Sequence, residues 1–138
     1  MTLCSTLWGT YELDEAWLDQ SSHIFLSAAD GRTHTLVIHR DPAGAGLSAE
    51  VYAEQQVKVL AQSLPGYAPS SAPALPQGRA RAWAYSWQSP RGSITQIQAV
   101  LPHPEAAVVF TLTGVPDIDA AARAKFLRTV LSTRVYGA

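Results

Sequence analysis

The chain has little cysteine and little charge, and each shortage excludes a class of protein. Cys4 is the only cysteine, which excludes an intrachain disulfide and a cysteine-rich zinc site. Charged residues make up 15% of the chain, against a usual ~25% in globular proteins. The formal net charge of −1 gives no electrostatic reason to expect nucleic acid as a partner. The surface is therefore either rich in small and neutral polar residues or partly apolar because a partner covers it.

Long apolar runs are absent as well. No stretch approaches the ~18 consecutive apolar residues that a transmembrane helix needs. The N-terminus has no early Lys or Arg ahead of an apolar run, so it does not resemble a signal peptide. We therefore expect a cytoplasmic protein with no direct membrane anchor. A length of 138 residues favours one domain, spanning residues 1–138.

The order of apolar runs and turn residues predicts an α+β fold. Strand character is found over residues 6–13, 22–28, 33–40, 80–88, 93–101 and 106–113. The Asp30-Gly31 pair between two of these runs predicts a hairpin. The Pro- and Ala-rich residues 68–78 predict a loop with at most a short edge strand.

Two helices complete the pattern. Ser48 is a suitable N-cap for the first, which Pro65-Gly66 ends. Pro116-Asp117 begins the second, whose apolar face comprises Ile118, Ala122, Leu127, Val130 and Leu131. Hairpin-connected strands with two widely spaced helices predict an antiparallel sheet of about six strands, with both main helices packed on one side of it.

Residues that carry chemistry are sparse and scattered. Cys4 has no neighbouring base, and the four histidines, His23, His34, His39 and His103, form no short metal-binding pair. Asp14, Glu15 and Asp19 flank a turn, where carboxylates commonly cap backbone N–H groups. Gly44-Ala45-Gly46 lacks the spacing and the lysine of a phosphate-binding loop. We assign no catalytic residue, no metal site and no cofactor, and we do not expect an enzyme.

Neutral amides occupy positions where the periodicity favours apolar side chains. Gln56 lies one helical turn from both Tyr52 and Leu60. Strand alternation places Gln96 and Gln98 on one face, together with Ile94 and Val100, and it groups Ser22, Ile24, Leu26 and Ala28 in the same way. These glutamines are either solvated or satisfied within the fold, or they line a groove for an apolar partner with accessible backbone polar groups. Periodicity alone leaves both interpretations open.

An ordered set of short motifs resembles a known family. Residues 12–21, ELDEAWLDQS, are similar to the ELP-x-x-W-x-D-x-S opening of DcrB-like domains, and most closely to that of the Eag chaperones of bacterial type VI secretion. Further similarities follow in order at Ile24-Phe25, residues 36–41, Tyr52-x-x-x-Gln56, residues 64–67, residues 85–88, Gln98 and residues 109–113.

The resemblance implies a DcrB/Mog1/PsbP-like fold and a specific task. Eag chaperones are homodimers that hold the N-terminal transmembrane helices of PAAR-containing effectors in the cytoplasm. They also assist the loading of the effector onto the secretion spike, without a cofactor. Carried over by motif, the groove residues are Ile24, Gln56 and Gln98. Ser22 stands where an aliphatic residue is expected, and it makes that edge of the groove more polar.

Other hypotheses follow from the same residues. A DcrB-like structural or interaction domain with no secretion role would be a monomer whose own helices cover its apolar sheet face. A small-molecule-binding or hydrolytic domain would need a closed pocket with convergent polar groups, to which we can assign no residues. Under the chaperone hypothesis, replacing Gln56 or Gln98 by Ala should weaken client recovery and leave the melting temperature nearly unchanged.

Overall fold

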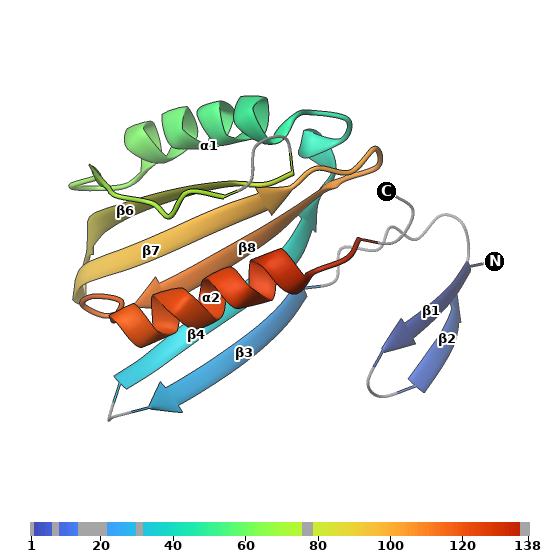
Figure 1. Cartoon of the computed structure of the whole chain (residues 1–138), viewed down its shortest axis with the longest axis horizontal. Helices are drawn as coiled ribbons and strands as arrows, with labels where there is room; N and C mark the ends of the chain where they lie inside the picture. Colours follow the sequence, from blue (N-terminus) through green and yellow to red (C-terminus); the bar gives the residue numbers. More distant parts are fainter. Residues whose placement is uncertain (1, 7–8, 14–21, 30–31, 76–78, 136–138) are drawn as a thin grey trace.

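A six-stranded antiparallel sheet forms the body of the protein (Figure 1). The computed structural model describes residues 2–6, 9–13, 22–29, 32–75 and 79–135. The strand order is β3-β4-β8-β7-β6-β5, with bounds Ser22–Ala29 (β3), Arg32–Asp41 (β4), Ala68–Ser70 (β5), Arg81–Ser89 (β6), Gly92–Leu101 (β7) and Ala107–Gly114 (β8). Among these residues, two further strands, β1 (Thr2–Thr6) and β2 (Gly9–Leu13), pair with each other and with no strand of the sheet. The predicted α+β class and six-stranded sheet are confirmed.

The two helices lie on opposite faces of this sheet. α2 (Ala120–Ser132) packs through Phe126 and Val130 on a core that includes Ala82 and Ala84 of β6. α1 (Ala49–Ser63) packs through Tyr52 and Ala53 on a second core that includes Trp83 and Tyr85 of the same strand. Successive residues of a strand point to opposite faces of the sheet. α2 therefore covers the face of Ala82 and Ala84, and α1 covers the face of Trp83 and Tyr85. The prediction that both helices pack on one side is therefore wrong.

The start of α1 matches the prediction and is reinforced by one aspartate. Ser48 is the N-cap, and its hydroxyl accepts a hydrogen bond from the Val51 N–H at 3.2 Å. The Tyr52 hydroxyl donates to Asp41 at 2.7 Å, and the second Asp41 oxygen accepts from the Ala43 N–H. Burial, with a smaller contribution from Asp41, raises the pKa of Tyr52 well above its ordinary value. The aspartate thus ties α1 to the loop that follows β4.

α2 begins later than the sequence indicates. Its N-cap is Asp119, whose carboxylate accepts from the Ala122 N–H at 2.7 Å, and not the predicted Pro116-Asp117 pair. Its buried face centres on Phe126 and Val130, while the predicted Leu131 is 41% exposed.

The strand predictions are mostly confirmed. Ala29 pairs with Arg32, so the hairpin between β3 and β4 has the predicted place, although residues 30–31 themselves lie outside the described residues. β5 is the predicted short edge strand. The single strand predicted over residues 6–13 is instead divided between β1 and β2. Within the part of the chain that the structure describes, no helix is long and apolar enough to cross a membrane.

Candidate functional site

α1 covers only part of its face of the sheet, and the rest is accessible. We call this accessible part the open face. It comprises Ser22, Ile24 and Leu26 of β3, Thr35, Val37 and His39 of β4, Thr111 and Thr113 of β8, and Gln96 and Gln98 of β7. Ile24 and Leu26 are 67% and 73% exposed. None of these ten residues is Asp, Glu, Lys or Arg.

The strand register aligns Ile24 with Gln98 in one row across the sheet. Ile24 lies opposite Val37, Val37 opposite Thr111, and Thr111 opposite Gln98. Three strand spacings of about 4.8 Å separate the ends of this row, so the open face is about 14 Å wide. The eight residues of β3 extend about 27 Å at ~3.4 Å per residue. An α-helix is ~10 Å across, so the open face is wide enough for one helix aligned with the strands. From Ser22 to Leu26 the open face extends about 14 Å along β3, which is about half the length of a 20-residue helix.

Two hydrogen-bonded units hold the glutamines of β7 in place. The Trp83 indole N–H donates to Gln98 Oε1 at 2.9 Å, and Gln98 Nε2 donates to Thr111 Oγ1 at 3.0 Å. Two residues away on β7, Gln96 repeats this arrangement. It accepts from the indole of Trp87 at 3.1 Å and donates to Thr113 at 3.0 Å. Each unit spans three adjacent strands.

The hydrogen bonds leave part of each amide available. A glutamine side chain has two N–H donors and an oxygen with two lone pairs. The Trp and Thr partners use one donor and one lone pair, so one of each remains for a partner molecule. The interpretation that these amides are satisfied within the fold is therefore correct for Gln96 and Gln98, and it does not exclude binding. It does change one expectation, because Gln98→Ala would remove two hydrogen bonds and lower stability.

Gln56 belongs to α1, the helix that covers the rest of this sheet face. It is half-buried on α1, one turn beyond Tyr52 and Ala53, which pack on the sheet. The structure thus places Ser22, Ile24 and Gln98 on one sheet face and Gln56 on the helix that covers the remainder of that face. The amide partners Trp83 and Thr111 could not be identified from the sequence, because the pairing of β6, β7 and β8 depends on register.

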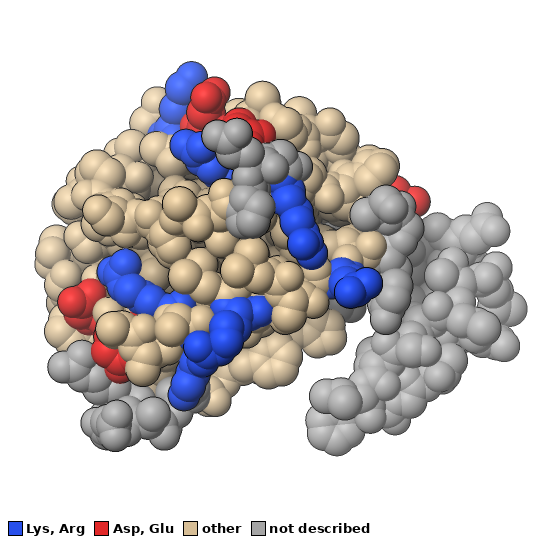
Figure 2. Space-filling view, in the orientation of Figure 1, with Lys and Arg blue, Asp and Glu red and all other residues tan. Residues whose placement is uncertain are grey.

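Charged side chains are visible on the α2 side of the molecule (Figure 2). Figure 2 shows the α2 side of the molecule, where Lys and Arg side chains are interspersed with acidic and uncharged residues. The open face belongs to the other side of the sheet, and none of its ten residues is Asp, Glu, Lys or Arg. An uncharged surface of this kind favours an apolar partner over a polyanion or an acidic peptide.

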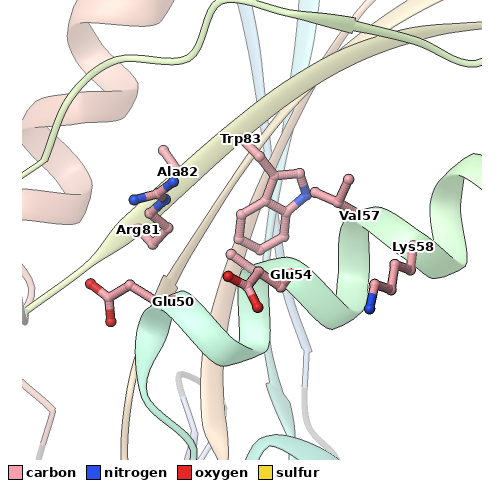
Figure 3. A pocket seen from close by; sticks show the side chains of 8 residues that line it. Glu50, Glu54, Val57, Lys58, Arg81, Ala82 and Trp83 are labelled. Carbon is pink, nitrogen blue, oxygen red and sulfur yellow. The ribbon is translucent and has the colours of Figure 1, made fainter.

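A cleft of about 390 Å³ lies between α1 and β6 (Figure 3). Its rim has mixed charge from Glu50, Glu54, Lys58 and Arg81, and Trp83 forms its wall. Its described lining residues include no serine, cysteine or histidine.

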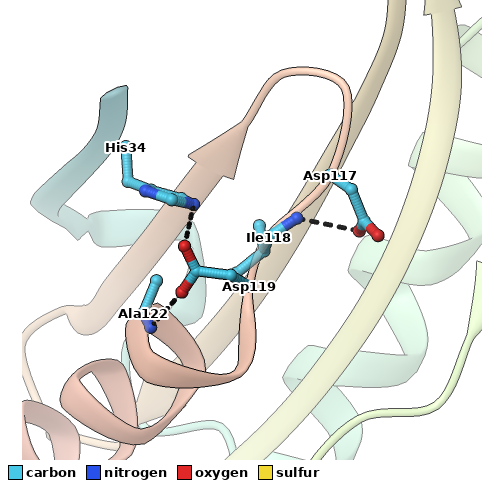
Figure 4. Close-up of polar contacts among 5 residues, drawn as sticks. All are labelled: His34, Asp117, Ile118, Asp119 and Ala122. Carbon is cyan, nitrogen blue, oxygen red and sulfur yellow. Dashed lines mark hydrogen bonds and ion pairs between the residues drawn. The ribbon is translucent and has the colours of Figure 1, made fainter. Parts of the chain in front are cut away.

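A buried histidine lies under the start of α2 (Figure 4). His34 is 5% exposed, and its Nε2 atom is 3.9 Å from Asp119 Oδ2 and makes no hydrogen bond. The same aspartate caps α2, so this pair joins β4 to the helix end. We interpret it as structural. No group of three His, Cys, Asp or Glu side chains suitable for a metal ion occurs among the described residues, and Asp14, Glu15 and Asp19 lie outside them.

The family model of DcrB matches residues 9–133. The chain belongs to the DcrB family. This family match covers all six strands of the sheet and both helices. Among curated proteins, no significant match is found.

Two solved structures are similar to this DcrB-family chain. One is PA94 from Pseudomonas aeruginosa, a protein of unknown function suggested to be a regulator. It has 25% identity and a TM-score of 0.75 over 98% of this chain and 96% of that one. The other is LpqN of Mycobacterium tuberculosis, which is involved in cell envelope biogenesis. Its identity is 19% and its TM-score 0.34, over 82% of this chain and 80% of that one.

Proposed function

We propose that this DcrB-family protein is a chaperone of type VI secretion. It binds the N-terminal transmembrane helices of a PAAR-containing effector in the cytoplasm, as a homodimer, and assists loading of the effector onto the spike. Two lines of reasoning support the proposal. One is the motif resemblance to Eag chaperones, and the other is the open face itself, which has no Asp, Glu, Lys or Arg and is wide enough for one helix.

The open face combines two properties that such a client needs. Ile24 and Leu26 offer exposed aliphatic surface, whose burial contributes about 25 cal/mol per Å². Gln96 and Gln98 each keep one free N–H, which can donate to a backbone carbonyl that small client residues leave accessible. A helix rich in Gly, Ala and Ser therefore fits better than one with bulky side chains all round.

The hydrogen-bonded units give the amides a fixed direction. A glutamine held by Trp and Thr partners loses little conformational entropy when a client binds, which improves affinity and register. The amides also keep the empty surface wetter than an all-aliphatic one and so limit self-association. Binding therefore remains reversible, as release to the spike requires.

The test is a detergent-free affinity capture of the tagged protein from its native host, with the bound proteins identified by mass spectrometry. Thr113→Lys places a charge within the open face, and Gln55→Lys adds the same charge at an exposed position of α1. Wild type and Gln55→Lys should recover a PAAR-type protein with N-terminal apolar helices, and Thr113→Lys should recover at least about tenfold less.

Two outcomes would contradict the proposal. One is that the wild type captures no other protein from cells that express the secretion system. The other is that Thr113→Lys recovers as much of the PAAR-type protein as the wild type does. Either would leave a DcrB-like interaction or structural domain with no role in secretion.

A further inference from the structure

A pocket lies on the face of the sheet that α2 covers, separate from the cleft between α1 and β6. It has a volume of about 130 Å³ and is bounded by α2 and by the strands β3, β4 and β8. Phe25 of β3 lies opposite Leu36 of β4, and Leu36 lies opposite Leu112 of β8. Ala122 and Phe126 of α2 close the other side. These five side chains make most of the pocket wall apolar.

Exposure to solvent falls steeply from one end of this pocket to the other. Phe25 is 51% exposed, and Leu26, which also borders the pocket, is 73% exposed. Leu112 and Phe126 are only 6% and 2% exposed. The pocket therefore opens at the edge strand β3 and ends among buried residues beneath α2. In Figure 1, α2 lies in front of β4 and β8, and β3 lies at the edge of the sheet.

His34 contributes a polar atom to the buried end. Its side chain lines the pocket from β4 and is 5% exposed. The Nε2 atom points toward Asp119 (Figure 4), but the 3.9 Å between Nε2 and Oδ2 is too long for a hydrogen bond. Among the described residues, no other group forms a hydrogen bond with Nε2. Because native proteins pair nearly all of their buried polar groups, an unpaired Nε2 in a pocket wall indicates a site for a hydrogen-bonding ligand.

The other polar side chains around the pocket differ from His34. Lys125 is exposed on α2, so its ammonium group is hydrated. The Thr129 hydroxyl already donates to the Lys125 carbonyl at 3.0 Å. Within the described part of the wall, a ligand at the buried end therefore meets apolar side chains and one hydrogen-bonding atom, His34 Nε2.

We propose that this pocket binds a small, uncharged aromatic alcohol with a single ring and one hydroxyl group. An apolar cavity of about 150 Å³ accommodates a benzene molecule, so about 130 Å³ suits one ring. The rings of Phe25 and Phe126 favour an aromatic ligand over an aliphatic chain. A hydroxyl group both donates and accepts, so it matches Nε2 in either tautomer of the imidazole. A charged ring would lose its hydration against the apolar wall.

The test uses NMR titration of the purified, isotope-labelled full chain without client. Phenol is the probe, and toluene, which has a similar size and no hydroxyl group, is the matched control. The wild type should bind phenol saturably with a Kd of about 1 mM or lower, which a ligand of this size can reach. The largest changes in chemical shift should occur in β4 and α2, beside the pocket. Phenol should bind at least as tightly as toluene, although its hydroxyl group must leave water.

Three variants locate the ligand. Ala122→Leu fills the pocket from α2 and should weaken phenol binding at least about tenfold. Ala124→Leu makes the same change at an exposed position of α2 and should bind phenol as the wild type does. His34→Leu removes the hydrogen-bonding atom, so it should bind toluene at least about fivefold more tightly than phenol. Circular dichroism will establish which variants are folded.

Three results would each overturn the proposal. The first is that the wild type shows no saturable binding of phenol. The second is that Ala122→Leu binds phenol as tightly as Ala124→Leu. The third is that the wild type prefers toluene as strongly as His34→Leu does. If one variant does not fold, the remaining comparisons still decide. None of these results involves a client or a second copy of the chain, so they are independent of the proposed function.

Discussion

Replacing Gln98 by Met should destabilise the fold through its indole partner. Methionine keeps the length of the side chain and removes the acceptor of the Trp83 N–H, which is bonded at 2.9 Å. Trp83 is only 7% exposed, and a buried donor left without a partner costs about 1–3 kcal/mol. We take about 2 kcal/mol as the expected loss in the free energy of unfolding.

The corresponding change in melting temperature follows from the size of the protein. An unfolding entropy of about 2.1 cal/mol/K per residue gives about 0.3 kcal/mol/K for 138 residues. A loss of about 2 kcal/mol therefore lowers the melting temperature by about 7 °C. Gln55→Met, at an exposed position of α1, is the matched control and should change stability by less than about 0.5 kcal/mol.

A double-mutant cycle with Trp83→Phe isolates the hydrogen bond. Urea unfolding followed by circular dichroism gives the free energies of the wild type, the two single variants and the double variant. The double variant should be about 1–2 kcal/mol more stable than the sum of the two losses predicts, because the bond is lost only once. Additivity within about 0.3 kcal/mol would refute the reasoning, since it would mean that the two side chains do not interact.

Three further predictions concern the framework around the open face. Burial raises the pKa of Tyr85, and burial with the Asp41 hydrogen bond raises that of Tyr52, so the unfolded chain loses these protons first as the pH rises. Stability should therefore fall above about pH 10, by up to about 1.4 kcal/mol per pH unit for each tyrosine, and urea midpoints independent of pH there would contradict this. Asp119→Ala removes the cap of α2 and should cost about 1 kcal/mol by thermal unfolding, whereas an unchanged melting temperature would argue against the cap. Gly114→Ala would place a methyl group against the Asp117 carbonyl and should lower the free energy of unfolding by about 1–3 kcal/mol. A variant as stable as the wild type would show that the loop at Asp117 moves aside without cost.

Local features of the fold could be predicted because local residues determine them. The Ser48 cap and the hairpin between β3 and β4 depend on residues within one turn of each other, and the structure has both the cap and the Ala29–Arg32 pair that closes the hairpin. The sequence predicts the start of α2 at Pro116-Asp117, two residues too early, because Asp117 and Asp119 are both suitable N-cap residues. Asp117 bonds the adjacent Ile118 N–H, which leaves Asp119 to cap the helix.

The placement of the helices could not be predicted, because the central strands are apolar on both faces. In β6, Ala82 and Ala84 face one helix while Trp83 and Tyr85 face the other, and all four are buried. Such a strand shows no polar side in the sequence, so nothing indicates whether one face or both are covered.

The position of Gln98 on an apolar face was predictable from alternation, but its environment was not. Its partners Trp83 and Thr111 lie on β6 and β8, and only the register of three strands brings them together. For the same reason, the alignment of Ile24 with Gln98 across the open face was not evident from the sequence.

Site-specific photocrosslinking in the native host tests the central claim most directly. Benzoylphenylalanine replaces Thr111 in the middle of the open face, or Gln62 at an exposed position of α1 as a control. The account predicts that the Thr111 position crosslinks to an N-terminal apolar helix of a PAAR-containing protein and that the Gln62 position does not. Crosslinks from Thr111 only to other parts of the same protein, or to a soluble segment of another, would contradict it.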